Sequence, residues 1–338
     1  MNAHARSLQP GLADSIADAG LAGAGASPNA RQPEVDPTGA RAWRIGVFAP
    51  SGQVLDPAVL DRAVQRLEDA GHSVHVDRTA RSAWQRFSAS DDERIAAFER
   101  MAAAPGVELA IAARGGYGIS RLLERIDFPS LARARKRWMG HSDFTAFSLA
   151  ALARAGMTSF AGPMASYDFG APDESAYTAS HCWALLASER YELGFDTPGT
   201  ARLGAEGMLW GGNLAMVAHL VGTPYLPAID GGILFLEDIG EHPYRIERML
   251  YQLHFAGVLA RQKAVLLGSF TGYTLGENDA GYDLPAMLAN VRARTGVPFI
   301  EGLPFGHCPD KVTLPVGGTC SLEMSGGRVR LLLSNYQP

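Results

Sequence analysis

Short apolar runs alternate with amphipathic segments along the first half of the chain, and this alternation restricts the possible folds more than any other feature. The apolar runs predict buried strands at 44–49, 73–76, 107–112 and 137–139. Between them, apolar residues at helical spacing predict helices at 57–70 and 91–103. Alternation of this kind predicts a parallel sheet with helices on its faces. Ligands bind such sheets at the carboxyl ends of the strands, so the residues that follow each strand are candidates for function.

The length of 338 residues exceeds one ordinary hydrophobic core and predicts two domains. We expect an α/β fold with an N-terminal Rossmann-like parallel-sheet domain at 44–165 and a smaller, β-rich C-terminal α/β domain at 207–338. Residues 166–206 predict the connection between the domains. Residues 1–43 are rich in Ala, Gly, Pro and Ser and predict a disordered tail. In the second domain the pattern predicts a helix at 244–255 and strands at 233–236, 264–267, near 312 and at 329–333.

The composition argues against several classes of protein. Hydrophobic residues make up 47% of the chain and charged residues 19%, as in ordinary globular proteins. The formal net charge of -5 provides no basic field for nucleic acid or an anionic membrane. No apolar run approaches the ~20 residues that cross a bilayer, and no secretory signal is recognisable, so we expect a cytoplasmic protein. The 3 scattered cysteines and the absence of an HExxH motif predict neither a disulfide framework nor a metal site.

The tetrapeptide Gly-His-Ser-Asp at 140–143 lies where an apolar strand breaks into an alanine-rich helix. A serine at such a junction exposes its hydroxyl beside the free backbone N–H groups of the new helix. This is the geometry of a nucleophile elbow, although the usual glycine two residues after the serine is absent. The alternative is that Ser142 and Asp143 only cap the helix.

A nucleophilic serine needs a base and a group that orients the base. Of the 9 histidines, His307 is favoured because it lies among prolines and glycines at 302–309, in a segment that is neither helix nor strand. The alternative is an ordinary surface histidine. Glu237 ends the apolar run 233–236 and is the candidate for the orienting acid. Its neighbour Asp238 fits the start of the following helix instead, where the macrodipole favours negative charge.

Other polar and glycine-rich segments have two interpretations each. Arg245 and Arg248 predict a solvated helix face, on which Arg245 can form an ion pair with Glu241 one turn away. The alternative is that one of the two arginines binds a substrate carboxylate. The consecutive glycines at 114–118 lack the spacing of a dinucleotide fingerprint or a P-loop. They suit an oxyanion-hole donor as well as a plain turn. The segment 211–213, Gly-Gly-Asn, predicts a tight turn that opens a helix.

Taken together, these segments resemble the serine LD-carboxypeptidases, the muramoyltetrapeptide carboxypeptidases, whose relatives include the microcin immunity proteins. The resemblance covers nearly everything after residue 44. It departs from the family pattern at His141, where a small aromatic such as tyrosine is common, and at Ala161, where a histidine is common. The blocks that carry the resemblance are 46–52, 114–123, 140–145, 162–164, 211–214, 236–248 and 302–317.

The resemblance implies a site in the cleft between the two domains. By position, the nucleophile falls on Ser142, the acid on Glu237 and the base on His307. It further implies an oxyanion hole from the backbone N–H groups of Asp143 and Gly116. Arg245 and Tyr117 are the candidates for substrate binding. No metal or organic cofactor is implied, the substrate is a small peptide or muropeptide, and a homodimer is expected.

Three other interpretations remain open from the sequence. The first keeps the triad and cleaves an amide in an aminoacyl-nucleotide, as in the immunity branch. The second is a two-domain protein that closes on a small ligand without catalysis. The third is a cysteine nucleophile at Cys308.

Overall fold

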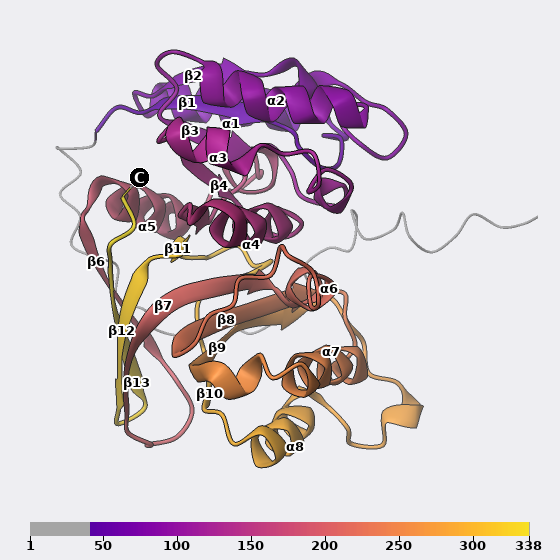
Figure 1. The fold of residues 1–338 in the computed structure, drawn as a ribbon, viewed down its shortest axis with the longest axis vertical. Coiled ribbons are helices and arrows are strands. Elements are labelled where there is room, and N and C mark those ends of the chain that lie inside the picture. The colour runs from indigo at the N-terminus through magenta and orange to yellow at the C-terminus, as the bar shows by residue number, and fades with distance from the viewer. Residues whose placement is uncertain (1–40, 338) are drawn as a thin grey trace, which may run out of the picture.

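The structure, a computed structural model, describes residues 41–337 and contains two sheets stacked with helices between and outside them (Figure 1). The mixed α/β fold with two sheets confirms the predicted fold class. The predicted tail lies outside the described residues as far as residue 40. Trp43, at the end of that segment, is buried, and its backbone N–H donates to His72 Nδ1 at 3.2 Å.

The first sheet has six strands in the order β11-β5-β4-β3-β1-β2. Five of them are parallel, and β11 pairs antiparallel to β5. The chain winds outward from β1 in both directions, so the switch point lies between β1 and β3, where ligands bind in doubly wound sheets. The strands are β1 (Arg44–Phe48), β2 (Ser73–Val76), β3 (Leu109–Ala112), β4 (Arg137–Gly140), β5 (Ser159–Ala161) and β11 (Leu314–Val316).

Helices cover this sheet and are delimited by local sequence signals. Pro57 occupies the first turn of α1, and the carboxylate of Asp56 accepts the N–H of Ala58 at 2.9 Å, which caps the helix. In α4 every residue from 144 to 151 is buried, because the helix lies between the two sheets (Figure 1). The helices are α1 (Pro57–Asp69), α2 (Asp91–Ala103), α3 (Phe128–Arg133), α4 (Phe144–Ala155) and α5 (Ala176–Ala187).

The second sheet has seven strands in the order β10-β9-β8-β7-β12-β13-β6. Its first four strands are parallel and its last three pair antiparallel. Helices α7 and α8 lie on the face away from the first sheet (Figure 1). The elements are β6 (Arg190–Asp196), β7 (Leu203–Asn213), α6 (Leu214–His219), β8 (Gly232–Ile239), α7 (Pro243–Phe255), β9 (Gln262–Thr271), α8 (Leu284–Thr295), β10 (Phe299–Glu301), β12 (Thr319–Ser325) and β13 (Arg328–Ser334).

The chain passes from one sheet to the other at more than one place. The segment 166–206 contains α5 and β6, and β6 forms the edge of the second sheet beside β13. After β10 the chain returns to the first sheet as β11, where Leu314 pairs with Ala161. The loop that precedes β11 therefore begins at the second sheet and ends at the first.

Candidate active site

The predicted elbow is present between β4 and α4. Ser142 has φ +61°, in the left-handed region, so the chain turns sharply between strand and helix. A non-glycine residue there costs roughly 1–3 kcal/mol, which surrounding contacts must offset. Gly115 lies directly against the serine, since a Cβ built on it would be 3.1 Å from Ser142 Oγ. Only glycine allows the loop after β3 to pass this close to the hydroxyl.

Asp143 joins the loops that follow three neighbouring strands. Its Oδ2 accepts from Ser51 Oγ at 2.7 Å and from the N–H of Ile119 at 3.0 Å. The side chain is buried and does not cap α4, so the capping interpretation fails for Asp143. Burial raises the pKa of Asp143, while these two hydrogen bonds lower it. Among the hydrogen bonds of residues 41–337, none uses the backbone N–H of Asp143 or Gly116, so both remain available as donors.

Glu237 and His307 are in direct contact. Glu237 is fully buried in β8, and its Oε2 lies 2.7 Å from His307 Nδ1 and 3.2 Å from the His307 N–H. A carboxylate accepts hydrogen bonds, so Nδ1 carries the proton and Nε2 of the neutral ring is free to accept one. Gly306 makes the approach possible, because its φ is +134° and a Cβ there would lie 3.0 Å from Glu237 Oε2.

Asn213 holds the other side of the Glu237 carboxylate. Its Nδ2 donates to Glu237 Oε1 at 3.2 Å and to Asp238 Oδ1 at 2.8 Å. The sequence placed Asp238 at the start of a helix, which is wrong: it lies in β8, is buried, and accepts the N–H of Ala215 at 2.9 Å. Strand β8 can continue past the apolar run 233–236 because the carboxylates of Glu237 and Asp238 have hydrogen-bond donors inside the protein. Burial, then the charge of Glu237, raises the pKa of Asp238 to about 6.

His141 connects the elbow to the histidine loop. Its ring meets the His307 ring edge-on, with centroids 5.1 Å apart. Nδ1 donates to the Gly162 carbonyl at 3.0 Å. Burial, then the charges of Lys311 and His307, holds the pKa of His141 well below its usual range, so the ring is neutral. The predicted base therefore lies beside the residue that precedes the predicted nucleophile. Within the described part of the chain, no hydrogen bond joins Ser142 to His307, whose side-chain partner is Glu237.

The remaining candidates lie in different surroundings. Tyr117 is 42% exposed beside the glycine loop and packs against Phe87. Arg245 forms the predicted ion pair with Glu241 at 3.7 Å, and no contact among residues 41–337 joins it to the three proposed catalytic groups. Cys308 donates to the Asp310 carbonyl at 3.1 Å, and burial raises the pKa of its thiol. A protonated thiol is a poor nucleophile, which argues against a cysteine mechanism.

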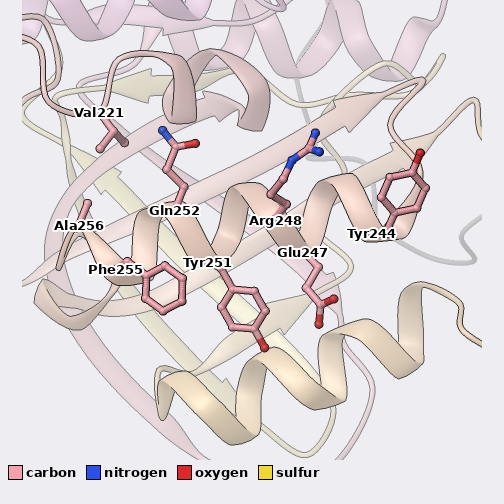
Figure 2. A pocket seen from close by; sticks show the side chains of 8 residues that line it. All are labelled: Val221, Tyr244, Glu247, Arg248, Tyr251, Gln252, Phe255 and Ala256. Carbon is pink, nitrogen blue, oxygen red and sulfur yellow. The ribbon is translucent and has the colours of Figure 1, made fainter.

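A groove of about 620 Å³ lies on α7, and none of the three proposed catalytic residues lines it. Figure 2 shows Tyr251 and Glu247 pointing towards one neighbouring helix while Gln252 and Arg248 point the other way. Asn290 of α8 donates to Glu247 Oε1 at 2.6 Å and to the Tyr251 hydroxyl at 3.1 Å, so helix packing accounts for these two side chains. Of the lining residues, Arg248 is a candidate from the sequence for binding a substrate carboxylate, and it lies in this groove.

Residues 41–337 contain no group of three or more His, Cys, Asp and Glu side chains arranged to hold a metal ion. Over the same residues no helix combines the length and apolarity needed to cross a membrane.

Sequence reasoning missed two sets of polar residues near the site. Asn213 was expected only to form a turn, and Lys311 and Asp168 were not singled out. A buried lysine cannot be recognised from sequence, since its carboxylate partner lies 143 residues away. The Gly-Gly-Asn segment offered a usable signal, because an asparagine directly after two glycines can cap a helix and approach a neighbouring strand closely.

The fold and this arrangement define a two-domain α/β protein with a serine at a strand-to-helix turn and a glutamate–histidine pair that packs against the residue before that serine. Residues 45–162 match the sequence model of the LD-carboxypeptidase N-terminal domain, and residues 206–322 match that of the LD-carboxypeptidase C-terminal domain. The chain belongs to the LD-carboxypeptidase family, which consists of serine carboxypeptidases.

Named relatives agree with this assignment. A probable murein peptide carboxypeptidase of Bacillus subtilis is 31% identical over 82% of this chain and 88% of its own. The murein tetrapeptide carboxypeptidase of Pseudomonas aeruginosa is 32% identical over 85% and 94%. The muramoyltetrapeptide carboxypeptidase of Oxalobacter formigenes superposes with TM-score 0.83 at 45% identity, over 87% and 99%. A microcin C7 self-immunity protein superposes with TM-score 0.79 at 21% identity over 88% and 97%, which shows a shared fold.

Proposed function

We propose that this chain removes the terminal D-alanine from murein tetrapeptides, cutting the amide between the L-centre of the diamino acid and D-alanine. The observation that carries the proposal is the 2.7 Å contact between buried Glu237 and His307 on a loop that packs against the serine elbow. The names of the relatives from Pseudomonas aeruginosa and Oxalobacter formigenes support this substrate class.

Ser142, His307 and Glu237 form the proposed triad. Ser142 Oγ attacks the amide carbonyl while His307 Nε2 accepts its proton and later delivers that proton to the leaving amine. Glu237 holds Nδ1–H and stabilises the imidazolium that forms between these steps. The free N–H groups of Asp143 and Gly116 bind the oxyanion, and each donor contributes roughly 2.7–4 kcal/mol to transition-state stabilisation.

Release of D-alanine from free tetrapeptide and from disaccharide-tetrapeptide tests the proposal. Ser142→Ala should lower turnover on the order of a million-fold while the circular dichroism spectrum is unchanged. Equal turnover in both proteins contradicts the role of Ser142. An aminoacyl-sulfamoyl-nucleotide serves as the comparison substrate, and faster cleavage of that amide favours the immunity-type activity. Tight binding of tetrapeptide without turnover favours a non-catalytic binding protein.

The cytoplasmic location and the homodimer accompany this proposal as predictions. Trimming during wall recycling acts on peptides that have already entered the cell. Fractionation of cells that produce the full chain tests the location. Light scattering coupled to size-exclusion chromatography tests the dimer.

A further inference from the structure

Lys311 is fully buried four residues after His307, in the loop that leads back to the first sheet. Its ammonium group forms an ion pair with Asp168 Oδ1 and lies 4.9 Å from the centre of the Tyr167 ring. The second oxygen of Asp168 accepts the N–H of Met164 at 2.7 Å. Removing either partner of such a buried pair leaves an uncompensated charge, so the pair resists separation.

Three hydrogen bonds also fasten this loop to the anchoring segment, residues 166–178, which contains Asp168 and leads into α5. The N–H of Lys311 donates to Thr178 Oγ1 at 2.9 Å, and Thr178 Oγ1 donates to the Pro309 carbonyl at 2.9 Å. Ser175 Oγ donates to Asp310 Oδ1 at 2.5 Å. The anchoring segment is itself held to the first sheet, because the N–H of Ser166 donates to the Ala113 carbonyl directly before the glycine loop.

Aromatic rings extend this attachment to the proposed base. Tyr167, next to Asp168, meets the His307 ring edge-on at 6.1 Å and the His141 ring at 5.7 Å. His141 Nδ1 also lies 3.9 Å from Asp168 Oδ2. Glu237, which is part of the second sheet, holds Nδ1 and the backbone N–H of His307 from that side. The rings and the ion pair contact the imidazole and its loop from the side of the first sheet.

We propose that the buried Lys311–Asp168 ion pair is a latch that holds the His307 loop over Ser142, and that Lys311 is a positioning residue for the reaction. The proposal rests on the proposed function, because it assigns His307 the role of base. Lys311 touches no reacting atom. It acts by holding an imidazole that must stay within about 0.5 Å and 10–20° of its productive geometry.

Four variants test the latch: Lys311→Met, Asp168→Asn, the double variant K311M/D168N, and the control Lys136→Met. Lys136 is also a buried lysine, but its Nζ donates to the carbonyls of Ala104 and Val107, and it precedes β4 whereas Ser142 follows the carboxyl end of that strand. Hydrogen–deuterium exchange of residues 307–313 is the readout that does not need activity. We expect at least tenfold faster exchange in K311M and in the double variant, and wild-type exchange at 307–313 in K136M.

The kinetic readout separates positioning from stability. K311M should lower kcat for D-alanine release on the order of 100-fold, the cost of misplacing a catalytic group by about 1 Å, with KM within about threefold. The double variant leaves no unpaired buried charge, so its melting temperature should recover while kcat stays low. If kcat recovers together with melting temperature, the pair is only structural and the proposal fails.

Failure of the proposed function gives a different pattern. If wild-type protein releases no D-alanine, the assigned activity is wrong, and exchange at 307–313 still decides the latch. Unchanged exchange in both K311M and the double variant overturns the latch whatever the activity. Faster exchange together with low kcat in the double variant supports it.

Discussion

Thr145 and Asn213 join the two halves of the proposed site: the backbone N–H of Asn213 donates to Thr145 Oγ1 at 3.0 Å. Thr145 lies in the first turn of α4, directly after the elbow. Asn213 ends β7 and holds the carboxylate of Glu237. One hydrogen bond therefore fixes the nucleophile-bearing helix against the strands that hold the acid, and close approach of the two backbones is a condition of the site.

Gly212→Ala should disrupt this approach. A Cβ there would lie 2.4 Å from Thr145 Oγ1, and φ is +137°. The strain and the clash together predict a loss of about 2–5 kcal/mol in unfolding free energy and at least a tenfold loss in kcat/KM. Urea denaturation and D-alanine release measure both. Gly222→Ala is the control, because φ is +81° with no atom within 4 Å; it carries strain alone and should keep full activity. Equal effects of the two substitutions would contradict the role of the contact.

Glu237→Gln should lower kcat by roughly 10³- to 10⁴-fold with little change in KM, because the amide stabilises the wrong histidine tautomer and carries no charge. Steady-state kinetics on tetrapeptide measure the effect. The control is Glu301→Gln on strand β10. It removes the carboxylate that forms an ion pair with Arg292 at 2.7 Å, and it should leave kcat unchanged. A loss below tenfold in the Glu237 variant would show that the residue does not orient the base.

Ser142→Gly should be more stable than Ser142→Ala by about 1 kcal/mol, because glycine adopts the φ of +61° without strain. Both variants lose the nucleophile, so the comparison isolates the backbone. Differential scanning calorimetry of the two proteins measures it. Ala280→Gly, at φ +46° in an exposed turn, should gain similar stability with full activity. A glycine variant that is less stable than the alanine variant would exclude stored strain at the elbow.

The unfolding free energy should fall as pH falls below about 6.5, in part because of His181. Burial lowers the pKa of His181 from 6.5 to about 4, so between these values the unfolded chain binds a proton that the folded protein does not. A depressed folded pKa contributes stability that is present above 6.5 and lost towards 4. At pH 5 the loss is roughly 2 kcal/mol. Denaturation of wild type and His181→Gln at pH 7.5, 6 and 5 measures the difference in slope. Parallel slopes would show that His181 titrates normally in the folded protein.

Strands β1 to β4 of the first sheet follow from the sequence alone, because they depend on short-range patterns. The strand at 73–76 and the helix at 91–103 coincide with β2 and α2, whose limits are set by apolar periodicity and by the capping serine at 90. Longer-range pairing was not predictable. Strand β6 lies in the segment expected to connect the domains, and it pairs with β13 at the edge of the second sheet. Strand β11 follows β10 of the second sheet but pairs with β5 of the first. Both pairings depend on which sheet edge is free in the folded protein, and neighbouring residues in the chain do not indicate this.

The site divides in the same way. An apolar strand that breaks into a helix at Ser142, and an apolar run that ends in Glu237, are local signals that single out both residues from the sequence. The local sequence pattern does not predict that the side chain of Asp238 is buried. That burial depends on Asn213 and on the N–H of Ala215, which come from another strand and the helix after it.

The amino-acid sequence by itself determined strands β1 to β4 of the first sheet, the serine at the turn, and the glycines that allow backbones to meet. Tertiary structure alone decided that Lys311 pairs with Asp168, that His141 packs against His307, and that Asp238 is buried. The physical reason is that periodicity and turn chemistry act over a few residues. The cost of burying a charge, by contrast, is offset only by partners that folding brings from distant parts of the chain.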